Sequence, residues 1–223
     1  VTLGVLVEKT AYRPLRNAPR MSIMISAIGV SFLLENLATY LFTGVPRGFP
    51  DIKVLTTTMK LGSLSLTVAT LITPFVTLML LYVVLFITNK TKIGMAMRAV
   101  SKDFETAKLM GININQVISI TFIIGSFLAA IGAVLWGSRY PSVMPLMGVM
   151  PGLKCFIAAV LGGIGNTTGA VLGGFILGMA EIMLITFLPS LTGYRDAMAF
   201  VILIIVLLVK PTGLLGEKVT DKV

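Results

Sequence analysis

Residues 66 to 88 read LTVATLITPFVTLMLLYVVLFIT, an apolar run without a charged residue. As a helix this run would be about 35 Å long, at about 1.5 Å per residue, and the hydrocarbon core of a bilayer is about 30 Å thick. Pro74 inside the run predicts a kink, which membrane helices tolerate when neighbours satisfy the freed backbone groups. The run is therefore predicted to be a membrane-spanning helix.

The rest of the chain follows the same pattern. Of its 223 residues, 56% are hydrophobic and only 12% are charged, whereas about 25% are charged in a typical soluble domain. Further crossings are predicted for residues 21–42, 117–136 and 197–209, and the apolar material supports five or six in all. The predicted fold is all-α: a polytopic transmembrane helical bundle that forms a single domain over residues 1–223.

The apolar stretch 152–188 does not have the pattern of a simple crossing, because it is interrupted by Gly162, Gly163, Gly165, Asn166, Thr167, Thr168 and Gly169. For the last span to start outside, the segment 143–188 must cross the bilayer an even number of times. Two short or broken helices that meet near Gly165 satisfy this count, and so does a re-entrant loop. The sequence predicts a broken or re-entrant Gly-rich helix pair and leaves both alternatives open.

The first seven residues are apolar, with neither an initiator methionine nor the basic start of a signal peptide. This is typical of the end of a crossing whose beginning is missing. The chain is therefore predicted to be N-terminally truncated, and to be inactive without the missing spans.

The chain is basic, with 18 Lys and Arg against 9 Asp and Glu. Most of these cations fall into three clusters, which are Lys9, Arg13, Arg16 and Arg20; Lys90, Lys92, Arg98, Lys102 and Lys108; and Lys210, Lys218 and Lys222. If all three clusters are cytoplasmic, the distribution follows the positive-inside rule. This charge distribution favours a multi-pass protein of the cell membrane with a cytoplasmic C-terminus over a protein that binds nucleic acid.

Residue types needed for common catalytic sites are missing. Histidine is absent and Cys155 is the single cysteine, which excludes His-based catalysis and zinc sites of the His/Cys type. The Gly-rich segment lacks the Gly-Lys-Ser/Thr of a phosphate loop. The chain is predicted not to be an enzyme and to hold no metal or cofactor of its own.

The polar segment 98–111 carries the most specific short motif. Residues 105–111 have the form Glu-x-Ala-x-x-x-Gly, within a short helix predicted over 102–110 with Ser101 as its N-cap and Gly111 just past its end. Phe104, Ala107 and Gly111 recur at i, i+3 and i+7, which gives an apolar face that can dock into the groove of a partner. The alternatives are a helix on the lipid surface and a plain connector.

Two other sets of residues are candidates for a translocation path. If the helix breaks at midplane depth, the freed backbone groups from Ile164 to Thr168 and the side chains of Asn166 and Thr167 would line an aqueous path. The candidate path residues in this segment are Gly163, Gly165, Asn166 and Thr167. The alternative is tight packing, since Gly165, Gly169 and Gly173 form a small-xxx-small stripe.

Glu35 and Asn36 lie inside the first span, where a carboxylate is costly unless it faces the bundle interior or water. They are candidates for the same path, and the alternatives are an interhelical hydrogen bond or a position near the outer interface. Glu181 is similar, and Arg195 with Asp196 is predicted to be an interfacial anchor or a local ion pair.

Four stretches together resemble the branched-chain amino acid permease family of the LivH type. They are residues 11–16 (AYRPLR), 98–111 (RAVSKDFETAKLMG), 151–165, with Pro-Gly-Leu-Lys and Ala-Ala-Val-Leu-Gly-Gly-Ile-Gly, and 210–216 (KPTGLLG). The resemblance covers essentially the whole chain in order and spacing. Two departures are the absence of further N-terminal spans and of an Ile-x-Leu-Pro after the motif, since Ile120 is followed by Thr121 and Phe122.

The resemblance implies a permease subunit of an ABC-type importer that moves branched-chain or other apolar amino acids into the cytoplasm. It implies a second homologous permease subunit, two ATP-binding subunits that hold ATP and Mg, and an extracytoplasmic amino-acid-binding protein, all working at the lipid bilayer. Glu105, Ala107, Gly111 and Phe104 would then form the contact that couples ATP hydrolysis to transport. The competing class is a stand-alone secondary transporter or channel for a small solute, which usually shows more ionisable residues inside the membrane or clear repeats.

Overall fold

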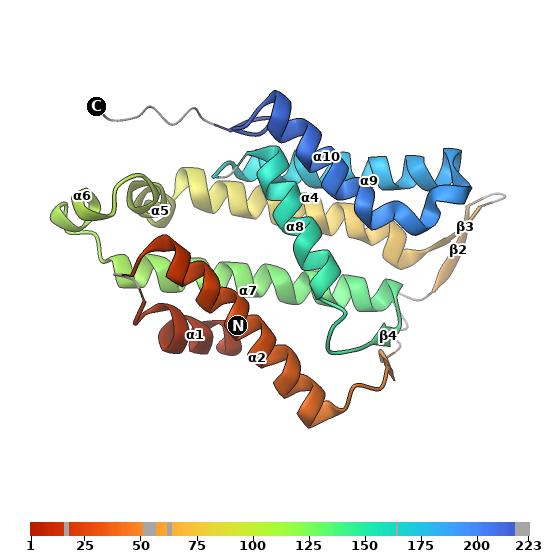
Figure 1. Cartoon of the computed structure of the whole chain (residues 1–223), viewed down its shortest axis with the longest axis horizontal. Helices are drawn as coiled ribbons and strands as arrows, with labels where there is room; N and C mark the ends of the chain where they lie inside the picture. Colours follow the sequence, from red (N-terminus) through yellow and green to blue (C-terminus); the bar gives the residue numbers. More distant parts are fainter. Residues whose placement is uncertain (16–17, 51–56, 62–63, 164, 217–223) are drawn as a thin grey trace. The chain divides into compact units, whose positions relative to one another are not determined.

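The computed structural model describes residues 1–15, 18–50, 57–61, 64–163 and 165–216, and omits the side chains of Arg20, Met24, Lys102 and residues 58–61 and 64–66. Arg16, Ile164, Lys218 and Lys222, which the sequence analysis considered, lie outside the described residues. The chain consists of two compact units, Val1–Pro145 (unit 1) and Leu146–Val223 (unit 2). Figure 1 shows that each unit is built mainly of helices.

Unit 1 contains three long helices and several short ones. The long helices are α2 (Arg20–Phe42), α4 (Val68–Lys90) and α7 (Ile114–Arg139), and the short ones are α1 (Thr2–Val7), the π-helical η1 (Glu8–Tyr12), α5 (Lys92–Lys102) and α6 (Phe104–Leu109). The segment formed by α1 and η1 contacts α7, where the Tyr12 and Phe122 rings lie 5.0 Å apart between centroids. α4 also contacts α7.

Short antiparallel pairings connect the helix ends of unit 1. β1 (Arg47–Gly48) pairs with β4 (Ser142–Val143), which joins the loop after α2 to the loop after α7. β2 (Thr58–Leu61) pairs with β3 (Leu64–Thr67) just before α4. The predicted start of this span at Leu66 is therefore corrected to Val68, because the β-branched Thr67 is still extended at φ −72° and ψ 138°.

Unit 2 contains α8 (Val149–Gly162), α9 (Thr167–Phe187), the 3₁₀-helical η2 (Pro189–Tyr194) and α10 (Arg195–Val209). α8 and α9 run antiparallel, since Gly162 lies against Gly169 and Ala158 against Gly173. α10 contacts both. The core of this unit consists of Ile157, Ala158, Leu161, Leu177 and Ala199, with partly buried residues of α10 and Leu214 packed against it.

Among the described residues, five helical segments are long and apolar enough to cross a membrane: Met21–Phe42, Val68–Lys90, Ile114–Arg139, Thr167–Phe187 and Pro189–Val209. Their apolar side chains are largely exposed in the isolated chain, as expected where lipid is the solvent. α8, with 14 residues, is shorter. The all-α polytopic fold is confirmed, and two helices do meet near Gly165. Whether residues 143–188 cross twice or re-enter stays a prediction.

Candidate functional site

The connection from α4 to α7 contains two helices where the sequence analysis expected a loop with one. Thr91 caps α5: its Oγ1 accepts a hydrogen bond from the Gly94 amide at 3.1 Å. The same hydroxyl donates to the Ile87 carbonyl at 2.6 Å, which ties the cap to the end of α4. The signal for α5 was the run of helix-favouring residues 95–100 (MAMRAV), which the surrounding lysines obscured.

α6 begins two residues later than a cap at Ser101 would allow. Asp103 is the N-cap: its Oδ1 accepts from the Glu105 and Thr106 amides at 3.1 Å each, and its Oδ2 accepts from Thr106 Oγ1 at 2.7 Å. Ser101 instead donates to the Arg98 carbonyl within α5. The predicted cap is corrected because a carboxylate can receive several amides at a helix start, whereas Ser101 lies inside the preceding helix.

The end of α6 matches the prediction for Gly111. This residue has φ +78°, a backbone conformation that glycine adopts without steric cost. Its amide donates to the Lys108 carbonyl and the Ile112 amide donates to the Ala107 carbonyl, both at 3.1 Å. These two bonds form a Schellman motif, which turns the chain sharply from α6 into α7.

The exposed face of α6 differs from the predicted docking face. Ala107 is only 3% exposed and packs within the chain, so it is removed from the surface offered to a partner. Phe104 is 41% exposed, and Leu109 and Met110 are 86% and 78% exposed. The acidic Glu105 is exposed beside them. The available surface of this turn therefore combines apolar side chains with the polar Glu105, Thr106 and Lys108, and Ala107 supports it from behind.

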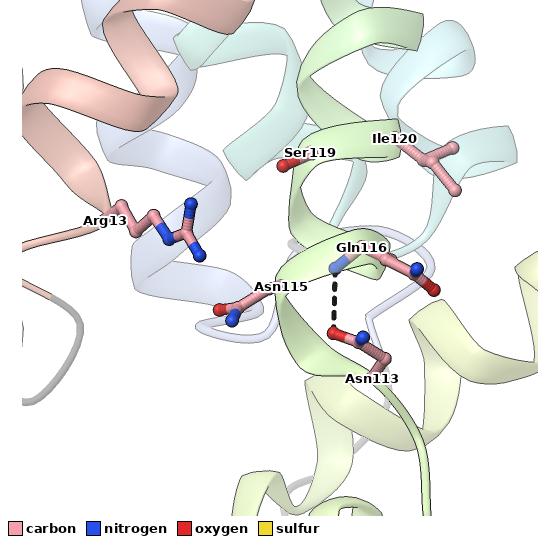
Figure 2. Close-up of a pocket in the computed structure, with 6 residues that line it drawn as sticks. All are labelled: Arg13, Asn113, Asn115, Gln116, Ser119 and Ile120. Atoms are coloured by element: carbon pink, nitrogen blue, oxygen red, sulfur yellow. Dashed lines mark hydrogen bonds between the residues drawn. The ribbon is translucent and has the colours of Figure 1, made fainter.

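A polar pocket of about 540 Å³ lies beside the first turns of α7. Its lining residues are Arg13, Asn113, Asn115, Gln116, Ser119 and Ile120, and Figure 2 shows the Arg13 guanidinium directed toward α7. The Ser119 hydroxyl donates to Glu8 at 2.9 Å, and Glu8 is completely buried. Sequence analysis missed this buried carboxylate, although an acidic residue directly after an apolar segment was a signal that it needs a partner.

The turn between α8 and α9 contains the predicted path residues Gly163, Gly165, Asn166 and Thr167. Gly163 and Gly165 have φ +110° and +93°. Both ends of the Asn166 amide are engaged, since Oδ1 accepts from the Gly169 amide and Nδ2 donates to the Leu215 carbonyl, each at 3.0 Å.

The C-terminal segment completes this turn. The Leu214 amide donates to the Leu161 carbonyl at 2.8 Å, and the Leu215 amide donates to the Gly162 carbonyl at 2.9 Å. The last carbonyls of α8, which would otherwise be unpaired at a helix end, are satisfied in this way.

The small-xxx-small alternative is confirmed for two of its three glycines. A Cβ at Gly169 would meet the Gly162 backbone, and a Cβ at Gly173 would meet the Ala158 carbonyl oxygen. Gly165 takes no part, since no atom lies within 4 Å of the position of its Cβ. Gly169 and Gly173 therefore allow the backbones of α8 and α9 to approach closely.

Glu35 and Asn36 lie on α2, in unit 1, whereas the turn with Gly163 lies in unit 2. Among the described residues, their side-chain hydrogen bonds stay within α2: Glu35 Oε1 accepts from Ser31 Oγ at 3.0 Å, and Asn36 Nδ2 donates to the Phe32 carbonyl at 2.7 Å. Their assignment to a translocation path stays a prediction, as does that of the turn.

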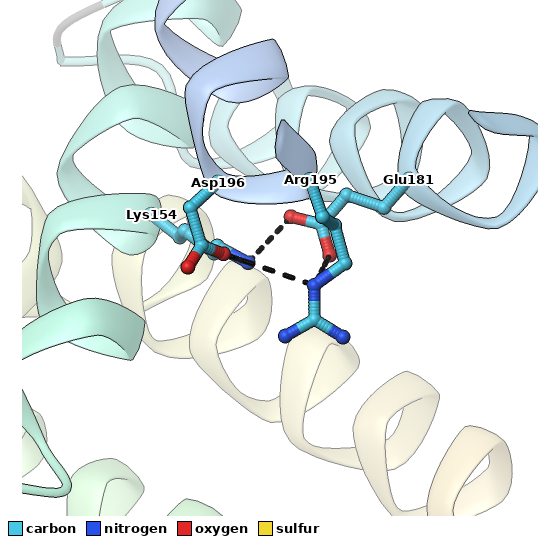
Figure 3. A network of polar contacts seen from close by, with 4 residues as sticks. All are labelled: Lys154, Glu181, Arg195 and Asp196. Carbon is cyan, nitrogen blue, oxygen red and sulfur yellow. Dashed lines mark ion pairs between the residues drawn. The ribbon is translucent and has the colours of Figure 1, made fainter. Parts of the chain in front are cut away.

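Four charged residues of unit 2 form a network that the sequence analysis did not assemble (Figure 3). Lys154 Nζ of α8 lies 2.7 Å from Glu181 Oε1 of α9 and 2.7 Å from Asp196 Oδ1 of α10. Arg195 Nε lies 3.8 Å from Glu181 Oε2 and 3.7 Å from Asp196 Oδ1. The pair Arg195 and Asp196 was expected, and the signal for the rest was Lys154, a cation in an apolar helix that requires acidic partners.

The sequence of this chain is similar to those of known transport proteins. A family model described as "Branched-chain amino acid transport system / permease component" matches residues 1–207. The chain is 39% identical to the high-affinity branched-chain amino acid transport system permease protein LivH of Escherichia coli K12 and 38% identical to LivH of Salmonella typhimurium. It is 37% identical to the permease protein BraD of Pseudomonas aeruginosa. Each alignment covers 99% of this chain and 72% of the relative. No solved structure matches.

Proposed function

Because the chain belongs to the family of permease components of branched-chain amino acid transport systems, we propose that it is a permease subunit of an ABC-type importer. It moves branched-chain or other apolar amino acids into the cytoplasm, while separate subunits bind ATP with Mg and hydrolyse it. The observation that carries the proposal is the similarity to LivH and BraD over 99% of this chain.

The proposal assigns the remaining partners by the same similarity. A second homologous permease subunit completes the path, and an extracytoplasmic amino-acid-binding protein delivers the substrate. The basic segments around Lys9, Lys90 and Lys210 face the cytoplasm, since Lys and Arg are enriched in the cytoplasmic loops of membrane proteins. The C-terminus is then cytoplasmic, in the cell membrane.

The coupling contact is the turn formed by α6, with Phe104, Glu105 and Gly111. Its support is local: the Asp103 cap and the Schellman motif at Gly111 hold a short, rigid helix that exposes Phe104, Leu109 and Met110. A rigid element on a membrane helix can transmit movement of an ATP-binding subunit as a rigid-body shift of α7. Ala107 contributes by packing beneath this surface.

The first test is ATP hydrolysis in proteoliposomes that hold the complete importer, with and without leucine-loaded binding protein. Gly111→Val should abolish the stimulation by loaded binding protein, because a β-branched residue is strained at φ +78°. Gly111→Asn should retain most of it, since asparagine tolerates this conformation. All variants should insert and assemble normally.

Gly148→Val is the matched control, because Gly148 has φ −80° and no atom lies within 4 Å of the position of its Cβ. It should hydrolyse ATP like the wild type. Leucine entry that proceeds down an ion gradient and ignores ATP and the binding protein would contradict the importer and favour a stand-alone transporter.

A further inference from the structure

The network of Lys154, Glu181, Arg195 and Asp196 brings both signs of charge together within unit 2. Glu181 lies six residues before the end of α9, which is about 9 Å of helix. Lys154 lies in the first half of α8, and Arg195 and Asp196 begin α10. The four residues thus lie at the end of the unit opposite the Gly163 turn, which the proposed topology places on the outer side. Lys154 and Glu181 lie inside apolar helices, where ionisable residues commonly mark a substrate or ion pathway.

The four residues differ in how far they are enclosed. The side chains of Lys154 and Glu181 are 24% and 19% exposed, whereas those of Arg195 and Asp196 are 43% and 41% exposed. Lys154 holds one oxygen of each acid at 2.7 Å. Lys154 and Glu181 therefore form the inner half of the network and hold the other two residues in place.

The outer half has unused donor and acceptor atoms. Arg195 makes its ion pairs through Nε, and Figure 3 shows its two terminal nitrogens pointing away from the two carboxylates. Asp196 makes its ion pairs through Oδ1, which is inaccessible to solvent. Among the described residues, no ion pair or hydrogen bond involves the Arg195 terminal nitrogens or Asp196 Oδ2.

These free atoms match the polar end of an amino acid. A guanidinium fork binds a carboxylate through two parallel hydrogen bonds. A carboxylate oxygen accepts from an ammonium group. The network is electrically neutral, with two cations and two anions, so a zwitterion can bind without leaving a net charge in the membrane.

We propose that Arg195 and Asp196 form a transient binding site for the zwitterionic end of the transported amino acid, at the outer end of unit 2. Arg195 binds the α-carboxylate through its terminal nitrogens, and Asp196 Oδ2 binds the α-ammonium. Lys154 and Glu181 are positioning residues: they hold Arg195 and Asp196 so that the Arg195 terminal nitrogens and Asp196 Oδ2 stay accessible to the ligand. The inference rests on the proposed function, because it takes an amino acid as the substrate.

The test measures binding of leucine to the complete importer in nanodiscs by calorimetry, without the binding protein and up to the solubility limit of leucine. Two analogues separate the two ends of the ligand: 4-methylpentanoate lacks the ammonium group, and 3-methylbutylamine lacks the carboxylate. Arg195→Lys keeps the charge and removes the fork, and should weaken binding of leucine and 4-methylpentanoate by about tenfold. It should leave 3-methylbutylamine unchanged. Asp196→Asn should weaken binding of leucine and 3-methylbutylamine, and should leave binding of 4-methylpentanoate unchanged.

Arg139→Lys is the matched control, because Arg139 is also an arginine at one end of an apolar helix but is the last residue of α7, in unit 1. It should bind leucine like the wild type. The inference is overturned if Arg195→Lys binds leucine normally, if both analogues bind as tightly as leucine, or if the wild type binds no leucine. The same purified variants in proteoliposomes, with the binding protein added, are assayed for ATP-driven leucine uptake. Failure of the proposed function would abolish uptake in the wild type, whereas failure of this inference alone would leave that uptake intact.

Discussion

At the scale of single residues, the helix α6 depends on one side chain at its start. Asp103 accepts three hydrogen bonds from Glu105 and Thr106, two from amides and one from a hydroxyl. The sequence alone favoured Ser101, because serine is a good cap and precedes the acidic turn. The structure assigns the cap to Asp103, since α5 extends through Lys102 and leaves Ser101 inside a helix.

Asp103→Ala should therefore loosen α6 selectively. Loss of an N-cap costs about 1 kcal/mol, which corresponds to roughly fivefold faster hydrogen exchange in a locally opening helix. We expect this increase at the amides of residues 105–109, measured by hydrogen exchange with mass spectrometry. Ser101→Ala is the control and should leave these amides unchanged, and equal effects of both substitutions would argue against the assignment of the cap.

Glu8 is the other residue with a large expected effect, because it is completely buried and bonded to Ser119. Glu8→Ala should lower the free energy of unfolding by about 1–3 kcal/mol, since the Ser119 hydroxyl loses its acceptor and a void remains. The measurement is thermal unfolding in detergent. Lys9→Ala, at the exposed neighbouring position, should leave the midpoint nearly unchanged. A Glu8 variant as stable as the Lys9 variant contradicts this role.

At the scale of elements, the pair α8 and α9 is held together by backbone contact. The Gly173 position lies against the Ala158 carbonyl oxygen, whereas Gly178 on the same helix has no atom within 4 Å of the position of its Cβ. Both glycines lie inside α9, so they form a matched pair for mutation.

Gly173→Leu should force the two helices apart and lower the unfolding midpoint strongly, because the backbone of α8 cannot move aside without disturbing the core around Ile157 and Leu161. Gly178→Leu should be tolerated. Thermal unfolding of both variants in the same detergent is the measurement. Equal stability of the two would show that the close approach is not needed.

The sequence predicted some elements well and others poorly, for physical reasons. The spans at α2, α4 and α7 were identified within a few residues, because an apolar run long enough to cross a bilayer has few alternatives. α5 was missed because Lys92, Arg98 and Lys102 make this segment as charged as a loop. The Gly169 and Gly173 packing was anticipated as an alternative, since small residues at a spacing of four point to close helix contact.

The charged network could not be assembled from the sequence. Lys154, Glu181 and Asp196 lie on three different helices, and hydropathy does not specify how helices face one another. Lys154, an isolated cation in an apolar helix, was not singled out, and by itself it would have indicated only that an acidic partner exists. Arg195 and Asp196, which are adjacent, were the part of the candidate site that could be paired from the sequence.

At the scale of the whole molecule, the proposed topology can be tested by labelling. In a Cys155→Ser background, which removes the single cysteine, Tyr140→Cys should react with a membrane-impermeant maleimide in intact cells. Lys108→Cys should react only after permeabilisation, because the positive-inside rule places α6 in the cytoplasm. Reaction of Lys108→Cys in intact cells would invert the topology and remove α6 from reach of a cytoplasmic ATP-binding subunit.

The hydrogen bonds from Leu214 and Leu215 to the end of α8 have a consequence for biosynthesis. Asn166 is translated 49 residues before its partner Leu215, an interval of about 2–10 s at about 5–20 residues per second. During that interval the glycine contacts hold the nascent hairpin of α8 and α9 together. The hydrogen bonds that Leu214 and Leu215 make to this hairpin have not yet formed. Ribosomes that stall in this window would hold an incomplete hairpin, and its maturation would wait until Leu214 and Leu215 are translated and leave the ribosome.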